Sequence, residues 1–335
     1  MVKIDLVTGF LGSGKTTFIR EYARYLLNKG EKICIIENDY GAVNVDMVLL
    51  QDLYGDNCNL EMIVGGDGKE AHRRRFRTKL ISMGMSGYDR VIIEPSGIYD
   101  VDEFFDVLYD EPLDRWYEIG NVISIVDAKS VSELSGVSRY LFMSEIACAG
   151  KIVLSKLSQD TDAQNVMGKI NEIMAEFGLG CSGKSKAPAN EPIGDKDEFW
   201  FSPEKHFIAK SFSDLTDSDF ENIEKAGYRH ASYVKLPLED EQYNPLFYFD
   251  VEMPVEKLKE ISESLFKDEK AGHIIRIKGF VKTGENSQAE LNATEKELSI
   301  TPIVSSKNVL IIIGEGLNKA YINDIFKDYC SQVSL

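Results

Sequence analysis

The chain has 335 residues, of which 43% are hydrophobic and 28% charged, and its formal net charge is −17. This length usually forms two domains, because a single core rarely grows beyond about 250 to 300 residues. The negative charge opposes a nucleic-acid partner, and no apolar stretch approaches the roughly 20 residues that span a bilayer. The five cysteines form no CxxC pair, so we expect reduced thiols in a cytoplasmic protein without a membrane partner.

The chain opens with an apolar run at residues 4–7, which we predict to be a strand because Lys3 and Asp5 interrupt any signal-peptide pattern. Further short apolar runs follow at 32–36, 90–93, 122–126 and 152–154, separated by helical patterns such as 16–27. Strands that alternate with helices form right-handed crossovers. We therefore predict an α/β fold with a doubly wound, mostly parallel sheet, whose ligands lie at the carboxyl ends of the strands.

Residues 9–16 read Gly-Phe-Leu-Gly-Ser-Gly-Lys-Thr and match the phosphate-loop pattern GxxxxGK[ST] at every position. Lys15 of this pattern reaches the β and γ oxygens of a nucleotide, and the hydroxyl of Thr16 binds Mg²⁺. The helix that follows aims its N-terminal dipole at the same anion. The backbone N–H groups that surround the phosphate come from the loop itself, at Gly9, Gly12, Ser13 and Gly14.

Acidic residues follow two of the predicted strands. Glu94 ends the run at 90–93 and is followed by Gly97, whose N–H can approach a γ-phosphate. Asp39 comes after the run at 32–36 and is our preferred residue for Mg²⁺, either as a direct ligand or behind the direct ligands, with Glu37 as the alternative. Carboxylates are the hard oxygen ligands that Mg²⁺ and an attacking water require. We predict Glu94 and Asp39, together with Lys15, as the catalytic group.

The run at 152–154 ends in Ser155-Lys156-Leu157-Ser158, where a GTPase carries Asn-Lys-x-Asp. Lys156, whose stem packs on the nucleotide base in such proteins, is present. Ser158 replaces the aspartate that accepts hydrogen bonds from guanine. A neutral hydroxyl cannot make those charged contacts, whose loss costs about 1.5 to 3 kcal/mol. Asp160 or Asp162 could substitute in a shifted loop, so both GTP and ATP stay open as the nucleotide.

The second half is predicted to form a smaller α+β domain at 229–335, after a first domain at 1–225 that includes a mobile loop at about 180–205 rich in Gly, Ser and Pro. Its predicted strands lie at 232–236, 274–281 and 309–313, and its predicted helices at 255–266 and 317–329.

With these motifs in place, the chain resembles the CobW-type family of P-loop GTPases, relatives of the nickel-insertion GTPases of urease and hydrogenase maturation. The resemblance rests on residues 9–17, Glu37-Asn-Asp-Tyr-Gly41 with Asp46, Glu94-Pro-Ser-Gly97, Val126-Asp-Ala128, Arg276-Ile-Lys-Gly-Phe280 and Ile312-Ile-Gly-Glu-Gly-Leu317.

The resemblance implies the following roles. Lys15, Thr16 and Thr17 hold the phosphates and Mg²⁺, and Asp39 and Glu94 complete the metal and water network. The base site falls on Ser155, Lys156 and Ser158. The family also implies a homodimer or a docked client protein at the nucleotide face, with hydrolysis timing the handover of a metal.

The chain departs from the family where most members carry Gly-Cys-x-Cys-Cys, because it has Gly65-Gly-Asp-Gly-Lys69 there. Thiolates are the soft ligands for Zn²⁺ and similar ions, so a transported transition metal is in doubt. Cys58 and His72 flank the segment as a possible partial site. The other histidines, namely His206, His230 and His273, are isolated and are read as surface or core residues.

The first hypothesis for the function is an Mg²⁺-dependent nucleoside triphosphatase, with GTP favoured by the family. It would act as a switch or chaperone in maturation of a metal- or corrinoid-dependent protein. Turnover should be slow, since only Arg73 and Arg74 of the basic run at 72–77 could serve as an arginine finger. A nucleotide-binding scaffold with little hydrolysis and a small-molecule kinase are the alternatives.

Overall fold

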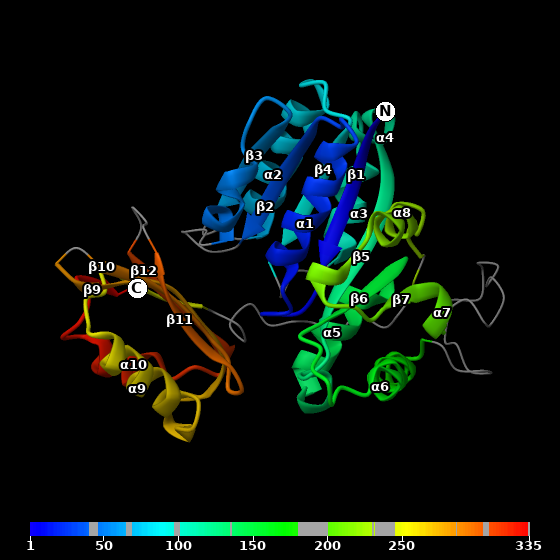
Figure 1. Ribbon diagram of the computed structural model, residues 1–335. Helices are drawn as coiled ribbons and strands as arrows, with labels where there is room; N and C mark the ends of the chain where they lie inside the picture. The colour runs from blue at the N-terminus through cyan, green and yellow to red at the C-terminus, as the bar shows by residue number, and fades with distance from the viewer. Residues whose placement is uncertain are drawn as a thin grey trace. The chain divides into compact units, whose positions relative to one another are not determined.

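The computed structural model describes residues 1–39, 46–64, 69–96, 101–134, 136–179, 200–229, 231, 245–285, 287–303 and 308–333. The chain divides into two compact units, Met1–Leu236 and Pro237–Leu335 (Figure 1). Within the described ranges, no helix is both long and apolar enough to cross a bilayer.

The first unit is built on a parallel sheet, with described strands in the order β3-β2-β4-β1-β5-β6-β7. The predicted apolar runs fall on β1, β2, β4, β5 and β6, because strands covered on both faces are apolar throughout. The predicted α/β fold class is thus confirmed. The strand bounds are β1 (Val2–Thr8), β2 (Ile33–Asp39), β3 (Cys58–Val64), β4 (Arg90–Pro95), β5 (Tyr117–Asp127), β6 (Lys151–Ser155) and β7 (Phe207–Ile208).

Helices cover both faces of this sheet. In Figure 1, α1 lies in front of the strands and α2 and α3 lie behind them. This follows from right-handed crossovers, because the step from β1 to β2 runs along the sheet in the direction opposite to the steps from β3 to β4 and from β4 to β5. The bounds are α1 (Lys15–Asn28), α2 (Lys69–Gly84), α3 (Val101–Leu108), α4 (Leu113–Trp116), α5 (Gly136–Ala147), α6 (Ala163–Glu176), α7 (Pro203–His206) and α8 (Asp217–Glu224), with 3₁₀ turns η1 (Asp46–Leu53), η2 (Val131–Glu133) and η3 (Phe212–Asp214).

The face that carries α1 is closed by aromatic packing between α1 and α8. Phe220 of α8 stacks on Tyr22 and Tyr25, with ring centroids 6.1 Å and 5.0 Å apart. These rings join Phe18 and the strand residues of the buried core on this face. The burial of apolar area here, worth roughly 25 cal/mol per Å², anchors α1 to the sheet.

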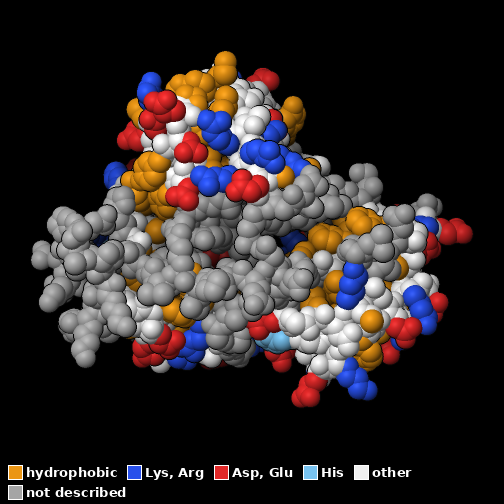
Figure 2. All heavy atoms as spheres, turned by 180° about the vertical axis from the view of Figure 1, so that it is seen from behind, with side chains coloured by type: hydrophobic (Ala, Val, Ile, Leu, Met, Phe, Trp, Pro, Cys, Tyr) orange, Lys and Arg blue, Asp and Glu red, His pale blue; other side chains and the backbone are white. Residues whose placement is uncertain are grey.

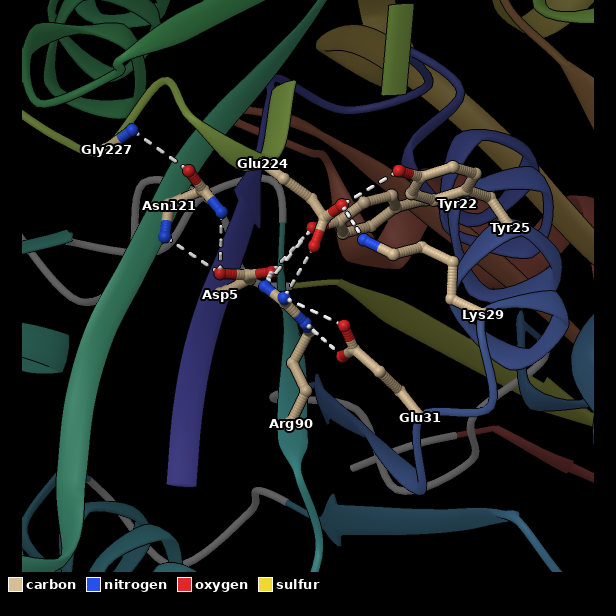
Figure 3. Close-up of polar contacts among 9 residues, drawn as sticks. All are labelled: Asp5, Tyr22, Tyr25, Lys29, Glu31, Arg90, Asn121, Glu224 and Gly227. Atoms are coloured by element: carbon tan, nitrogen blue, oxygen red, sulfur yellow. Dashed lines mark hydrogen bonds and ion pairs between the residues drawn. The ribbon is translucent and has the colours of Figure 1, made fainter. Parts of the chain in front are cut away.

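A buried charge network lies on the same side of the unit (Figure 3). The Arg90 guanidinium pairs with Asp5 at 2.6 Å, with Glu31 at 2.9 Å and with Glu224 of α8 at 2.9 Å. The Arg90 and Asp5 side chains are 1% and 0% exposed. Asn121 donates two further hydrogen bonds to Asp5. The network therefore joins strands β1, β4 and β5 to the end of α8.

The second unit is an antiparallel sheet whose described strands follow the order β11-β10-β9-β12-β8-β13. Side chains of α9 and α10 pack into one buried core with its strands, with Leu258 and Phe326 among them. Gly279 has φ 156°, and a Cβ there would lie 2.0 Å from the Val309 carbonyl oxygen, so only glycine fits. The bounds are β8 (Leu246–Phe249), α9 (Val255–Leu265), η4 (Glu269–Ala271), β9 (His273–Gly284), β10 (Ser287–Ala293), β11 (Leu298–Ile303), β12 (Val309–Glu315), α10 (Lys319–Phe326) and β13 (Gln332–Val333).

Several predicted boundaries differ from the structure. Residues 180–199 of the predicted loop at about 180–205 lie outside the described residues. The predicted end of this loop is wrong because α7 begins at Pro203, and proline is well suited to a first helical position. The predicted strand at 232–236 also lies outside the described residues. The last helix is shorter than predicted, since Asn318 caps α10 by accepting from the Tyr321 N–H.

Candidate functional site

The phosphate loop connects the end of β1 to the start of α1, as the sequence predicts. Its turn is closed by the Ser13 N–H, which donates to the Phe10 carbonyl at 3.1 Å. The residue before α1 is Gly14, and no side chain caps the helix there. The first N–H groups of α1 therefore face outward as donors for an anion. Three loop residues have positive φ angles, at Gly9 (143°), Gly12 (76°) and Gly14 (98°).

Gly9 is required by close packing as well as by its φ angle. A Cβ at this position would lie 2.3 Å from the Ile125 carbonyl oxygen and 2.7 Å from the Ser13 hydroxyl. Both distances are far below a normal contact, and one of the two atoms belongs to the backbone of β5. The loop can therefore keep this path only with glycine at its first position.

Lys15 and Thr16 are both turned inward at the start of α1. Lys15 is 7% exposed, and its ammonium donates to the Gly9 carbonyl at 2.8 Å, so the side chain arches over the loop. Thr16 is 8% exposed, and its hydroxyl donates to the Glu94 carboxylate at 2.9 Å. The structure thus brings together the loop and the strand-end carboxylate that the sequence predicts. Thr17 is exposed at the surface of the same turn.

A second buried carboxylate lies beside Glu94. Glu37 of β2 is aligned with Glu94 of β4, and partners in neighbouring parallel strands point to the same face of the sheet. Glu37 is 3% exposed and Glu94 is 5% exposed. The alternative metal residue Glu37 therefore lies next to the predicted one.

Two other predicted residues can be placed only in part. Asp39 is the last residue of β2 and is aligned with Val64, but its side chain lies outside the description. Gly97 lies outside the described residues, directly after Ser96. Their roles remain predictions.

The predicted base site is tied to the phosphate loop. The Ser155 hydroxyl donates to the Ser13 carbonyl at 2.5 Å and lies 3.2 Å from the Val126 carbonyl. The Lys156 ammonium pairs with Asp127 at 2.9 Å, from a backbone with φ 52°. Strand β6 therefore places Ser155 and Lys156 beside the loop, and their role in binding the base stays a prediction.

Ser158 lies in a separate turn. Its N–H donates to the Thr161 hydroxyl at 2.9 Å, and the two hydroxyl groups are 2.9 Å apart. Asp162, one of the possible substitutes for the missing aspartate, instead caps α6 by accepting from the Asn165 N–H. Asp160 is exposed in the same turn. Of the acidic substitutes, Asp160 is the one left without a helix-capping role.

The sequence motifs missed Phe212, which lies in η3 after β7. Its ring is edge-on to Phe18 at 5.8 Å, and its Cε2 would lie 3.4 Å from a Cβ on Gly14. Phe212 therefore borders the phosphate loop from a segment about 200 residues further along the chain. No local pattern marks it, because the contact arises only when β7 joins the sheet.

The predicted arginine candidates make contacts away from the phosphate loop. Arg73 lies 3.8 Å from Asp110, and the Arg74 Nε donates to the Glu70 carbonyl of its own helix. On the face drawn in Figure 2, Lys and Arg side chains are interspersed with Asp and Glu. Within the basic run, Arg74 is exposed but His72 and Phe76 are buried, so only part of the run forms a solvated helix face.

The hypothesis of a partial metal site made by Cys58 and His72 is wrong. Cys58 begins β3, whereas His72 lies in the first turns of α2, after the other end of that strand. A strand of this length spans about 20 Å, which is too far for a shared ion. Across the described ranges, no three His, Cys, Asp or Glu side chains gather as metal ligands would. The segment at 65–68 lies outside the description.

A phosphate loop between a parallel strand and a helix, faced by strand-end carboxylates, defines the class of P-loop nucleotide-binding α/β proteins. Residues 3–178 match the family model for the CobW/HypB/UreG nucleotide-binding domain, so the chain belongs to this family. The predicted family is thereby confirmed.

Curated relatives match over part of their length. The chain is 29% identical over 162 residues to the zinc chaperone YeiR of Escherichia coli, covering 48% of each chain. It is 29% identical over 186 residues to the zinc chaperone YjiA of the same organism, covering 52% of this chain and 54% of YjiA. The chain thus spans about half the length of these relatives.

Solved structures resemble the chain more distantly. Zn(II)-bound YjiA GTPase from E. coli is 20% identical, with 98% of both chains covered and a TM-score of 0.34. The hydrogenase maturation factor HypB from Archaeoglobus fulgidus is 17% identical over 66% of this chain and 85% of its own, with a TM-score of 0.39.

Proposed function

We propose that the first unit binds GTP and slowly hydrolyses it with Mg²⁺, and that this cycle acts as a switch or chaperone in the maturation of a metal- or corrinoid-dependent protein. The observation that carries the proposal is the phosphate loop. Lys15 arches over it, Thr16 bonds to Glu94, and the N-terminus of α1 carries no capping side chain. These are the parts that phosphoryl transfer to water uses.

The residues present fit Mg²⁺. Hard oxygen donors lie at neighbouring strand ends, since the Thr16 hydroxyl contacts Glu94 of β4 and Glu37 is aligned with Glu94 on β2. Thr16 and Glu94 would hold the ion, with Asp39 as the third predicted ligand. Mg²⁺ bound there would neutralise charge on the β and γ phosphates. The site therefore supports a magnesium nucleotide rather than a free anion.

The chain's own groups would act on the phosphates directly. Lys15 would leave the Gly9 carbonyl in part and donate to the phosphate oxygens, while loop N–H groups would stabilise the same charge. Glu94 would orient the attacking water together with Asp39 and the Gly97 N–H. Because the described contacts of Arg73 and Arg74 lie elsewhere, we expect slow turnover in the absence of a partner.

The choice of GTP rests on the family and on Lys156, which lies beside the loop with its ammonium held by Asp127. Ser158 offers only a hydroxyl to the base, so guanine would be held less tightly than by an aspartate. A scaffold that binds nucleotide but hydrolyses little is the alternative that this substitution favours.

The chaperone role is supported by relatives that are named zinc chaperones. It extends to a protein client, or a second copy of the chain, docked at the nucleotide face. The proposal includes no transition-metal site, because the chain has glycine, aspartate and lysine where most of the family has cysteines.

The test is a competition experiment followed by a turnover measurement. GTP and ATP compete for the purified full chain with Mg²⁺ present, and GTP should bind at least about tenfold more tightly, or roughly 1.4 kcal/mol. Phosphate release from GTP should then fall in Glu94→Gln while binding persists. Equal binding of both nucleotides would restrict the family resemblance to the fold. Unchanged release in Glu94→Gln would remove Glu94 from the mechanism.

A further inference from the structure

Strand β11 forms an unprotected edge of the second unit's sheet. Among the described strands it pairs with β10 alone, and the register of the two strands has no shift. Natural edge strands usually carry charged side chains or a bulge, because their free N–H and C=O groups can pair with another strand. The sequence of β11, Leu-Ser-Ile-Thr-Pro-Ile, contains no charged residue. The edge is therefore open to pairing with a further strand.

The hydrogen-bond pattern of the hairpin indicates which backbone groups of β11 are free. The turn is closed by a bonded pair, since the Thr294 N–H donates to the Glu297 carbonyl at 2.7 Å. Bonded and non-bonded pairs alternate along an antiparallel ladder, so Leu298, Ile300 and Pro302 fall at non-bonded positions. Pro302 fits this alternation because it has no N–H to donate to β10. The N–H and C=O groups of Leu298 and Ile300 therefore point away from β10, toward the open edge.

A groove of about 530 Å³ is lined by this strand and by helix α9. Its apolar lining comes from Val255 and Phe266 on the helix and from Leu298 and Ile300 on the strand. Val255 is 37% exposed although its side chain is apolar. The volume lies within the range of about 300 to 1,000 Å³ that is usual for ligand sites. A free strand edge beside an apolar groove suits an extended peptide, because backbone bonds give affinity and pockets for alternate side chains give specificity.

The charges along the groove include one ammonium without an ion-pair partner. On the α9 side, Lys259 lies 3.8 Å from Glu263, whereas Lys267 pairs with no group in the described part of the chain. Lys267 lines the groove together with the turn at residues 294–297, which immediately precedes β11. A strand added antiparallel to β11 has its carboxyl end at this turn. An acidic residue at that end therefore complements the Lys267 ammonium.

We propose that the groove between α9 and β11 binds an extended, mostly apolar segment of a protein partner as an added antiparallel strand. The free N–H and C=O groups of Leu298 and Ile300 bond the backbone of this segment, and every second side chain enters the groove. An acidic residue near the carboxyl end of the segment pairs with Lys267. The surface belongs to the second unit alone, so peptide binding is independent of the proposed nucleotide binding.

The experiment titrates a labelled peptide into the full chain in the absence of nucleotide. The probe is a short, C-terminally amidated peptide that alternates threonine and valine and ends in aspartate. One control peptide ends in lysine instead, and another carries N-methyl groups on alternate backbone amides. The aspartate peptide should bind at least about fivefold more tightly than the N-methylated one, because each lost backbone hydrogen bond leaves a carbonyl unpaired.

Protein variants locate the site. Lys267→Glu should bind the aspartate peptide at least about threefold more weakly than the wild type, as expected for an exposed ion pair. Its control is Lys270→Glu, which alters an exposed lysine that does not line the groove and should bind like the wild type. Ile300→Pro removes an outward N–H and should bind more weakly than Ile300→Ala, which keeps it. If Ile300→Pro folds poorly, the N-methylated peptide tests the same bonding on the unaltered chain.

Three results would overturn the inference. The first is the absence of aspartate-peptide binding by the wild type. The second is equal binding of the aspartate and N-methylated peptides, or equal binding by Lys267→Glu and Lys270→Glu. The third is a dimer in sedimentation analysis that Ile300→Pro dissociates, since a second copy of the chain would then occupy the edge of β11.

Discussion

Removing the Arg90 guanidinium should destabilise the first unit more than any surface charge change. In Arg90→Met, the buried Asp5 loses its cation but keeps hydrogen bonds from Tyr22 and Asn121. Glu224 keeps Lys29, whose ammonium lies 2.5 Å away (Figure 3). Breaking a buried ion pair by removing one partner costs about 3 to 5 kcal/mol. We expect a loss in this range, which is a large part of the about 5 to 15 kcal/mol that stabilises a typical domain.

The assay is urea unfolding followed by tryptophan fluorescence. Both tryptophans, Trp116 and Trp200, belong to the first unit, so the signal reports on that unit alone. The control is Arg139→Met, which removes a half-exposed pair with Glu176 and should cost at most about 1 kcal/mol. If Arg90→Met lost no more stability than Arg139→Met, the buried network would not hold α8 to the sheet as described.

Two other predictions concern the site and acid stability. Gly9→Ala should fold but lose nucleotide binding by at least about tenfold, because its Cβ would displace the Ser13 hydroxyl and the β5 backbone. Unchanged binding in a competition titration would refute the close approach of Gly9 to these two groups. Burial, with Arg229 and Lys205 nearby, lowers the pKa of His206 from 6.5 to about 4. The unfolded chain therefore takes up this proton first, so the stability that neutral His206 contributes above pH 6.5 is lost as pH falls toward 4. The unfolding midpoint of His206→Asn should fall less than that of the wild type between pH 7 and pH 5, and equal decreases would contradict this.

The phosphate loop and the central strands could be predicted because their signals are local. The glycines at positions 9, 12 and 14 need positive φ angles wherever such a loop binds a phosphate, and strands covered on both faces are apolar from end to end. Strand β3 was missed because it alternates polar residues such as Asn59 and Glu61 at a sheet edge. The hairpin of β10 and β11 was missed because its strands also alternate buried and exposed positions.

Long-range contacts could not be predicted from the sequence. Glu145 lies within an apolar helical stretch, and nothing local indicates that the hydroxyl of Thr8, 137 residues away, would donate to its carbonyl. The ion-pair partners of Arg90 come from three separate segments, and Phe212 meets Gly14 only after β7 has joined the sheet. The carboxylate pair of Glu37 and Glu94 was foreseen in part, since both follow apolar runs, but their alignment depends on the strand order.

The central claim, that the phosphate loop binds a nucleotide through Lys15, is tested most directly by titrating a fluorescent GTP analogue into the full chain with Mg²⁺. Lys15→Ala is compared with Lys3→Ala, which removes an exposed lysine from β1 outside the loop. The wild type and Lys3→Ala should bind alike, and Lys15→Ala should bind at least about tenfold more weakly, as expected for loss of a charged hydrogen bond. Equal binding by all three proteins, or no binding by the wild type, would contradict the account.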